Sequence, residues 1–176
     1  MRHHKTTLFR LQKCPKTTPV CVVFFLAGTL PSTALIYLRQ LGLLGMLARL
    51  GDSSVLQYIG RGALLSNTPY KSWFQQLRSV SEQYCLPDPL FILQTPFSKE
   101  SWKNKCRAMV TSWWKHRLRG EASVLPSLCY FQPSFMFLSK PHPMWTMADN
   151  PHEVIKATTV ATMLSGRYVT EHKTRY

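Results

Sequence analysis

The sequence predicts a mainly α-helical protein, an irregular helical domain of about six or seven helices with a region rich in proline and aromatic residues. Apolar residues recur at three- and four-residue spacing in several segments. A capping side chain followed by proline opens several of those segments. Alternation of apolar and polar residues never persists, and VCVVFF, residues 20–25, is the only β-branched run that favours a strand.

The composition favours a folded chain with an anionic partner. The 176 residues are 45% hydrophobic and 17% charged, which is typical of a globular domain with a sizeable core. The chain contains 22 Lys and Arg but only 8 Asp and Glu, so its formal net charge is +14. That excess is larger than solubility requires, so we expect a nucleic acid, an anionic membrane surface or an acidic protein as partner.

The chain begins with a basic segment, residues 1–17, which predicts a short amphipathic helix that ends before Pro15. Thr18 and Pro19 then form a helix start, because a capping side chain precedes a proline at the first helical position. Gly28 suits the end of that helix, since glycine readily adopts the left-handed conformation found there.

A second apolar helix is expected from Pro31 to Gly51. Gly42 and Gly45 lower its helix propensity but would let a neighbouring element approach closely. Its spaced leucines and its only charges are Leu35, Leu38, Leu41, Leu44 and Leu47 with Arg39 and Arg49.

Residues 17–38 carry no charge, so a signal sequence or a membrane span over residues 19–38 is an alternative. The break from Gly28 to Pro31 argues against it. The uninterrupted apolar run is only about eight residues long, a length that indicates a buried core helix rather than a membrane span.

Three shorter helices follow, over residues 52–66, 67–86 and 89–93. The first is expected to bury Val55, Leu56 and Ile59. The second starts at Thr68 and Pro69, and its spacing predicts one buried face made of Trp73, Leu77, Val80 and Tyr84. The third would be a single turn before Pro96.

A longer helix is expected from a Ser98 cap to about Leu118, with Gly120 just beyond its end. Its buried stripe would hold Trp102, Cys106, Met109, Val110 and Trp113. Trp114 lies about 100° from Trp113 on a helix, outside that stripe.

The last part of the chain combines an irregular segment with one more helix. Residues 121–148 contain several prolines and aromatic residues, so regular structure there must be short. Asn150, Pro151 and Glu153 predict a helix start with a capping box, and Gly166 its end. We therefore expect a basic arm over 1–17, one domain over 18–168 and a frayed basic tail over 169–176.

The cysteines do not predict a metal site or a disulfide framework. Their number is odd, no two are closer than seven positions, and no C-x-x-C occurs. We expect reduced, mostly buried thiols in an intracellular protein, nuclear or cytoplasmic. The five are Cys14, Cys21, Cys85, Cys106 and Cys129.

The sequence does not predict an enzyme. No two of the eight carboxylates are closer than four positions, so no local cluster is available to hold metal ions for phosphoryl transfer. Phosphate-binding glycine loops and the G-x-S-x-G nucleophile turn are absent. We therefore expect no catalytic residue, metal, cofactor or small-molecule substrate.

The segment SWWKHRLRG, residues 112–120, is the best candidate for function. Its cations could contact phosphates, and Trp114 could stack on an unpaired base. The alternative is structural: cations favour a helix C-terminus, and Trp114 packs on the proline-rich segment. The candidate nucleic-acid contacts are Lys99, Lys103, Arg107, Trp114, Lys115, Arg117 and Arg119.

Several long strings resemble non-LTR retrotransposon proteins of invertebrate animals, which are endonuclease–reverse transcriptase polyproteins. They are FLAGTLP with ALIYLRQLGLLGMLARLG, SWFQQLRSVSEQYCLPDPL, RLRGEASVLPSLCYFQPSFMFLSKPHP and NPHEVIKATTVATMLSGRY. The similar part lies after the polymerase domain, in the thumb and linker region, and covers nearly all of residues 3–168.

This sequence lacks the family's paired-aspartate polymerase motif, its endonuclease and its Cys/Cys/His/Cys zinc knuckle. The resemblance therefore implies no catalytic or metal residue. It implies a helical, basic, noncatalytic segment that helps to hold RNA or DNA beside a retroelement polymerase domain, as a fragment or degenerate copy. A structural remnant without independent function is the second hypothesis, and a small membrane protein inserted through residues 19–38 is the third.

Overall fold

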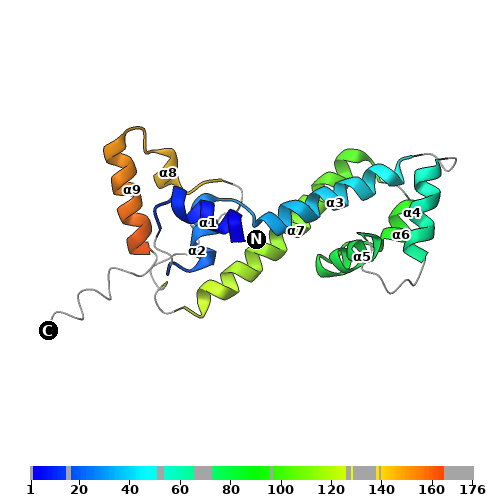
Figure 1. The fold of residues 1–176 in the computed structure, drawn as a ribbon, viewed down its shortest axis with the longest axis horizontal. Coiled ribbons are helices and arrows are strands. Elements are labelled where there is room, and N and C mark those ends of the chain that lie inside the picture. The colour runs from blue at the N-terminus through cyan, green and yellow to red at the C-terminus, as the bar shows by residue number, and fades with distance from the viewer. Residues whose placement is uncertain are drawn as a thin grey trace. The chain divides into compact units, whose positions relative to one another are not determined.

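A computed structural model describes residues 2–14, 17–50, 54–65, 73–95, 97–125, 128, 138 and 140–164. Over this part of the chain every regular element is a helix, which confirms the predicted all-α class (Figure 1). The expected features at Pro15, Gly51, Thr68, Pro69 and Gly166, and the tail, lie outside the described residues.

The helices of the described segments follow the expected order, with one more short helix in the proline-rich region. They are α1 Arg2–Leu11, α2 Val20–Ala27, α3 Ser32–Ala48, α4 Val55–Leu65, α5 Trp73–Gln83, α6 Pro89–Gln94, α7 Lys99–Ser123, α8 Pro143–Thr146 and α9 Pro151–Leu164.

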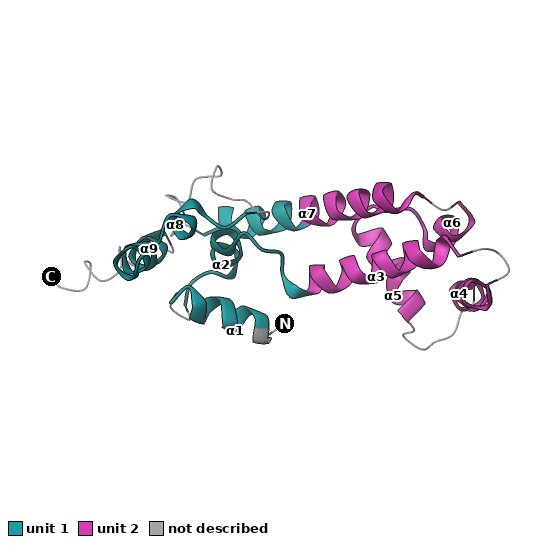
Figure 2. Cartoon of the chain, turned by 90° about the horizontal axis from the view of Figure 1, so that it is seen from above, with its two compact units in different colours: residues 1–32, 114–176 teal, residues 33–113 magenta. Residues whose placement is uncertain are grey.

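The chain forms two compact units, whereas the sequence suggested one domain over residues 18–168 (Figure 2). Unit 1 comprises residues 1–32 and 114–176, and unit 2 comprises residues 33–113. The expected arm, residues 1–17, belongs to unit 1, because α1 packs on α2 and buries Phe9. The Gln12 side chain also donates a hydrogen bond from Nε2 to the Val23 carbonyl oxygen, at 3.0 Å.

The core of unit 1 is α2, where every residue from Cys21 to Leu26 is buried. Gly28 ends the helix with φ 60°, as predicted, and its N–H bonds to the Phe25 carbonyl oxygen at 3.1 Å. Any larger residue at Gly28 would collide with the Lys140 backbone. The His142 N–H donates to the Leu26 carbonyl oxygen at 3.0 Å, so the chain around Lys140 is fixed to the end of α2.

The predicted start of α9 is confirmed, with one difference in its cap. The Asn150 Oδ1 accepts from the Glu153 N–H at 3.0 Å, as expected. The Glu153 carboxylate reaches back to the N–H of Asp149, at 3.0 Å, rather than to that of Asn150. Both bonds satisfy backbone donors at the helix entrance.

Unit 2 contains most of α3, all of α4, α5 and α6, and the first part of α7. Gly45 on α3 faces the Trp102 indole so closely that a β-carbon there would collide with the ring. The Trp102 Nε1–H donates to the Leu41 carbonyl oxygen at 2.7 Å. The expected close approach at Gly45 is therefore confirmed, and Trp102 is the residue that uses it.

The expected buried face of α4 was wrong. Val55 is 69% exposed, and Leu56 and Ile59 are also exposed. Gln57, Gly60 and Leu64 are buried instead. The buried Gln57 side chain donates a hydrogen bond to the Leu93 carbonyl oxygen, so a polar residue of α4 occupies the inner face.

The Ser98 cap of α7 is confirmed, with its Oγ accepting from the Ser101 N–H at 3.3 Å, but the helix runs through Gly120 to Ser123. Its buried side chains recur every four residues: Trp102, Cys106, Val110, Trp114, Leu118 and Ala122. Each step of four advances about 40° around a helix, so the buried face winds by about 200° along α7. A straight stripe was the wrong expectation, and Trp114 is core.

Three of the four described cysteines are buried, as expected, and none of the four forms a disulfide in this structure. Burial raises the pKa of the Cys14 thiol to about 11. Cys85 is exposed, and Cys129 lies outside the described residues.

Within the described segments, no single helix is long and apolar enough to cross a membrane. Helices α2 and α3 together have the length and apolar composition of a membrane span, but the chain bends at the break between them.

Candidate functional site

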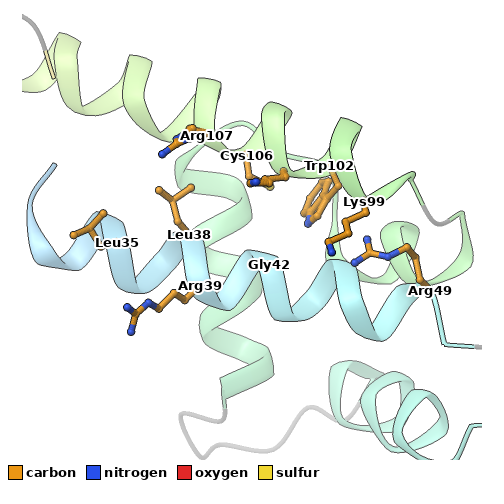
Figure 3. A pocket seen from close by; sticks show the side chains of 10 residues that line it. Leu35, Leu38, Arg39, Gly42, Arg49, Lys99, Trp102, Cys106 and Arg107 are labelled. Atoms are coloured by element: carbon orange, nitrogen blue, oxygen red, sulfur yellow. The ribbon is translucent and has the colours of Figure 1, made fainter. Parts of the chain in front are cut away.

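The clearest candidate site is a pocket of about 390 Å³ in unit 2, between α3 and the first turns of α7 (Figure 3). The two helices lie side by side there, with side chains of both turned toward the space between them. We call it the α3–α7 pocket. Its lining is Leu35, Leu38, Arg39, Gly42, Arg49, Lys99, Trp102, Lys103, Cys106 and Arg107.

Five cations surround this pocket, and no carboxylate lines it. Lys99, Lys103 and Arg107 recur every four residues on α7, so they follow one side of that helix. Arg39 lies on α3, and Arg49 follows directly after the last residue of that helix, Ala48. All five residues are exposed, so the cations can meet a partner from solvent.

Two of these cations lie at the same end of the pocket. Figure 3 shows Lys99 and Arg49 pointing toward one another across the pocket mouth. Two positive charges at the same end of a pocket favour an anion there. This end of the pocket therefore suits a phosphate or carboxylate.

The inner surface of the pocket is apolar. Leu35, Leu38 and Cys106 contribute to it, and the buried Trp102 ring closes it. The Trp102 ring also stacks on Phe97, with ring centroids 5.8 Å apart and planes inclined by 18°. Together with the bond from its Nε1, this stacking fixes the indole in place.

Gly42 opens the pocket. No atom outside the helix backbone lies within 4 Å of where its β-carbon would be. The two glycines of α3 thus have different roles. Gly45 allows the Trp102 ring to pack against the helix, whereas Gly42 leaves part of the pocket empty.

Cys106 is the one lining residue whose side chain could carry a negative charge. Burial raises the pKa of this thiol to about 12, so the thiol is neutral at neutral pH. The pocket lining is therefore positively charged without an opposing anion.

The structure groups the sequence-predicted contacts into two sets. Lys99, Lys103 and Arg107 share the α3–α7 pocket. Lys115, Arg117 and Arg119 follow Trp114 in unit 1.

Trp114 does not offer the open ring that a base would need. It is 6% exposed, and the Arg117 guanidinium lies over its ring, 5.4 Å from the centroid. Arg117 is also paired with Glu121, at 3.3 Å between Nε and Oε1. Placing Trp114 outside the buried stripe was wrong, because the stripe itself winds around α7.

Arg39 and Arg49 were missed as site residues. They were recognised as the only charges of their helix, but the face of α3 that meets α7 was not assigned. A signal was present: within the helix that the sequence predicts over 31–51, Arg39, Gly42 and Arg49 are three and seven residues apart, a spacing that favours one helix face.

A second cavity, of about 290 Å³, lies in unit 1 beside Trp114. Its charged lining residues are Lys5, Arg117 and Glu121, and the last two are paired. This cavity is closer to charge balance than the α3–α7 pocket and is less suited to an anion.

No group of three or more His, Cys, Asp or Glu residues that could hold a metal ion occurs among the described residues. No protein-family model, no curated protein and no solved structure matches this chain.

Proposed function

We propose that this chain is a noncatalytic nucleic-acid-binding segment that accompanies the reverse transcriptase of a retroelement. One observation carries the binding part: five exposed cations surround an apolar pocket that no carboxylate lines. Phosphate backbones are bound by such groups of Lys and Arg. The retroelement part rests on the sequence resemblance, and a polymerase domain is the partner it implies.

Binding of the purified full chain to single-stranded RNA and to duplex DNA over a series of salt concentrations tests this function. We expect the logarithm of the affinity to fall linearly with the logarithm of the salt concentration. Lys103→Glu combined with Arg107→Glu should weaken binding and reduce that slope by about 1–2.

A matched control separates the site from general charge. Arg10→Glu with Lys156→Glu exchanges two exposed cations of α1 and α9 for acids, so each double variant lowers the net charge from +14 to +10. The control pair should change affinity much less. Equal losses in both double variants, or no binding by the wild type at low salt, would contradict the proposal.

A scaffold role is the second candidate, because α4 carries an exposed apolar face. Tyr58 is 79% exposed, and Val55, Ile59 and Leu65 are also more than half exposed. Apolar patches of this kind mark surfaces that pack against another protein. Under this role, Val55→Lys with Ile59→Lys should improve solubility without lowering the unfolding temperature, as light scattering and circular dichroism would show.

A further inference from the structure

We propose that the α3–α7 pocket holds one unpaired nucleobase while the cations around it hold the flanking phosphates. This inference rests on the proposed function and specifies its ligand as single-stranded nucleic acid. Its starting observation is that one small site combines two chemistries, an apolar interior and a rim of five cations. A nucleotide unit has the same two parts, a flat base with apolar faces and an anionic phosphate.

The arrangement of the lining residues matches those two parts. Leu38, Gly42, Trp102 and Cys106 lie along the middle of the pocket (Figure 3). Lys99 and Arg49 point toward one another at one end, and Arg107 lies toward the other. Lys99 and Arg107 are eight residues apart on α7, about 12 Å along the helix axis. A base between two phosphate contacts is therefore consistent with the placement of these groups.

The pocket volume favours an unpaired nucleobase over an acidic helix or a base in a duplex. A pocket of about 390 Å³ is at the small end of ligand sites and has room for a base-sized group. An acidic amphipathic helix would need a longer groove, with anchors at three- and four-residue spacing. A base in a duplex is stacked and paired, so only an unpaired base can enter.

The pocket has few groups that could read the identity of the base. No carboxylate, amide or hydroxyl side chain lines it, and the Trp102 Nε1–H is already bonded to the Leu41 carbonyl oxygen. Among the lining side chains, only the Lys and Arg residues of the rim can therefore donate hydrogen bonds to the edge of the base. We therefore expect binding of single strands with little dependence on sequence, as in sites that rely on base contact and charge.

Gly42→Leu provides a sharp test because it fills the pocket without changing charge. Gly42 lines the pocket and its β-carbon position is open, so we expect the leucine side chain to occupy pocket space. Gly62→Leu on α4 is the matched control, since its β-carbon position is equally open and Gly62 does not line the pocket. Circular dichroism and the unfolding temperature establish that both variants are folded.

The full-length chain would be titrated with labelled single-stranded RNA and with the same RNA carrying abasic sites, which keeps every phosphate. We expect the wild type to prefer the intact RNA roughly tenfold, the order of magnitude of one base contact. Gly42→Leu should lose that preference and keep the salt slope, and Gly62→Leu should keep both. Duplex DNA should bind more weakly than single strands and respond less to Gly42→Leu.

The outcomes separate this inference from the function on which it rests. Salt-dependent RNA binding that responds to Lys103→Glu with Arg107→Glu, but neither to abasic sites nor to Gly42→Leu, overturns the base pocket and leaves the proposed function standing. No RNA binding at low salt overturns both. If Gly42→Leu weakens binding to vesicles of phosphatidylcholine and phosphatidylglycerol and leaves RNA binding unchanged, the pocket is a lipid site and the inference is wrong.

Discussion

Trp113 and Trp114 are adjacent in the chain but occupy different environments. The Trp113 ring meets Tyr84 edge-on in unit 2, with centroids 5.5 Å apart and planes at 86°. Trp114 belongs to unit 1, where it is buried beneath the Arg117 guanidinium. Edge-to-face and cation–π contacts of this kind stabilise a fold. Both tryptophans thus have a structural account, and the cations of the α3–α7 pocket become the stronger functional signal.

The glycines of α3 give a residue-scale prediction. Gly42→Ala should raise the free energy of unfolding by about 0.5–1 kcal/mol, because alanine favours the helix and its β-carbon meets no neighbour. Gly45→Ala should lower it by about 1–3 kcal/mol, because its β-carbon overlaps the Trp102 indole. Urea unfolding followed by circular dichroism measures both. Equal effects of the same sign would show that α3 and Trp102 do not approach closely at Gly45.

At the scale of the element, several helix boundaries were predictable, whereas the start of α2, the end of α7 and the buried faces were less so. Gly28, Ser98 and Asn150 act on backbone groups within a few residues, so the local sequence defines each boundary. The buried face of α4 includes Gln57, whose side chain bonds to the carbonyl oxygen of Leu93, 36 residues further along the chain. The same dependence hid Arg39 and Arg49, whose role requires knowing where α7 packs.

The cap of α8 gives an element-scale prediction about pH. The His142 Nδ1 accepts from the Met144 N–H at 3.3 Å, which requires an unprotonated nitrogen. Burial lowers the pKa of His142 below its usual 6.5, since burial disfavours the charged imidazolium. The unfolded chain therefore binds the proton more tightly, and the stabilisation present above pH 6.5 is lost as the pH falls below that value.

His142→Asn tests this cap, because asparagine retains a capping oxygen but does not titrate. We expect the unfolding temperature of the wild type to fall more steeply between pH 7 and pH 5 than that of the variant, given the usual histidine pKa. Thermal unfolding followed by circular dichroism measures both slopes. Parallel slopes would mean that His142 does not couple the stability of unit 1 to pH.

At the scale of the whole molecule, the two units differ in how the chain builds them. Unit 2 is the continuous segment 33–113, whereas unit 1 joins residues 1–32 to residues 114–176. Unit 1 thus forms only when distant segments meet, and closing so long a loop carries an entropic cost. The sequence indicated the helices of both units, but not this division, because the second boundary, between Trp113 and Trp114, falls inside the continuous helix α7.

This division predicts that the units open separately in the full chain. Leu26, in α2, and Leu77, in α5, are both fully buried. Each change to alanine should cost about 2–5 kcal/mol, and the cost should fall mainly on the unit that holds the residue. In hydrogen exchange followed by mass spectrometry, Leu26→Ala should speed exchange in α1, α2 and α9, and Leu77→Ala in α4, α5 and α6. If either variant speeds exchange equally in both sets of helices, the chain unfolds as one cooperative body, and the α3–α7 pocket would then depend on the integrity of unit 1.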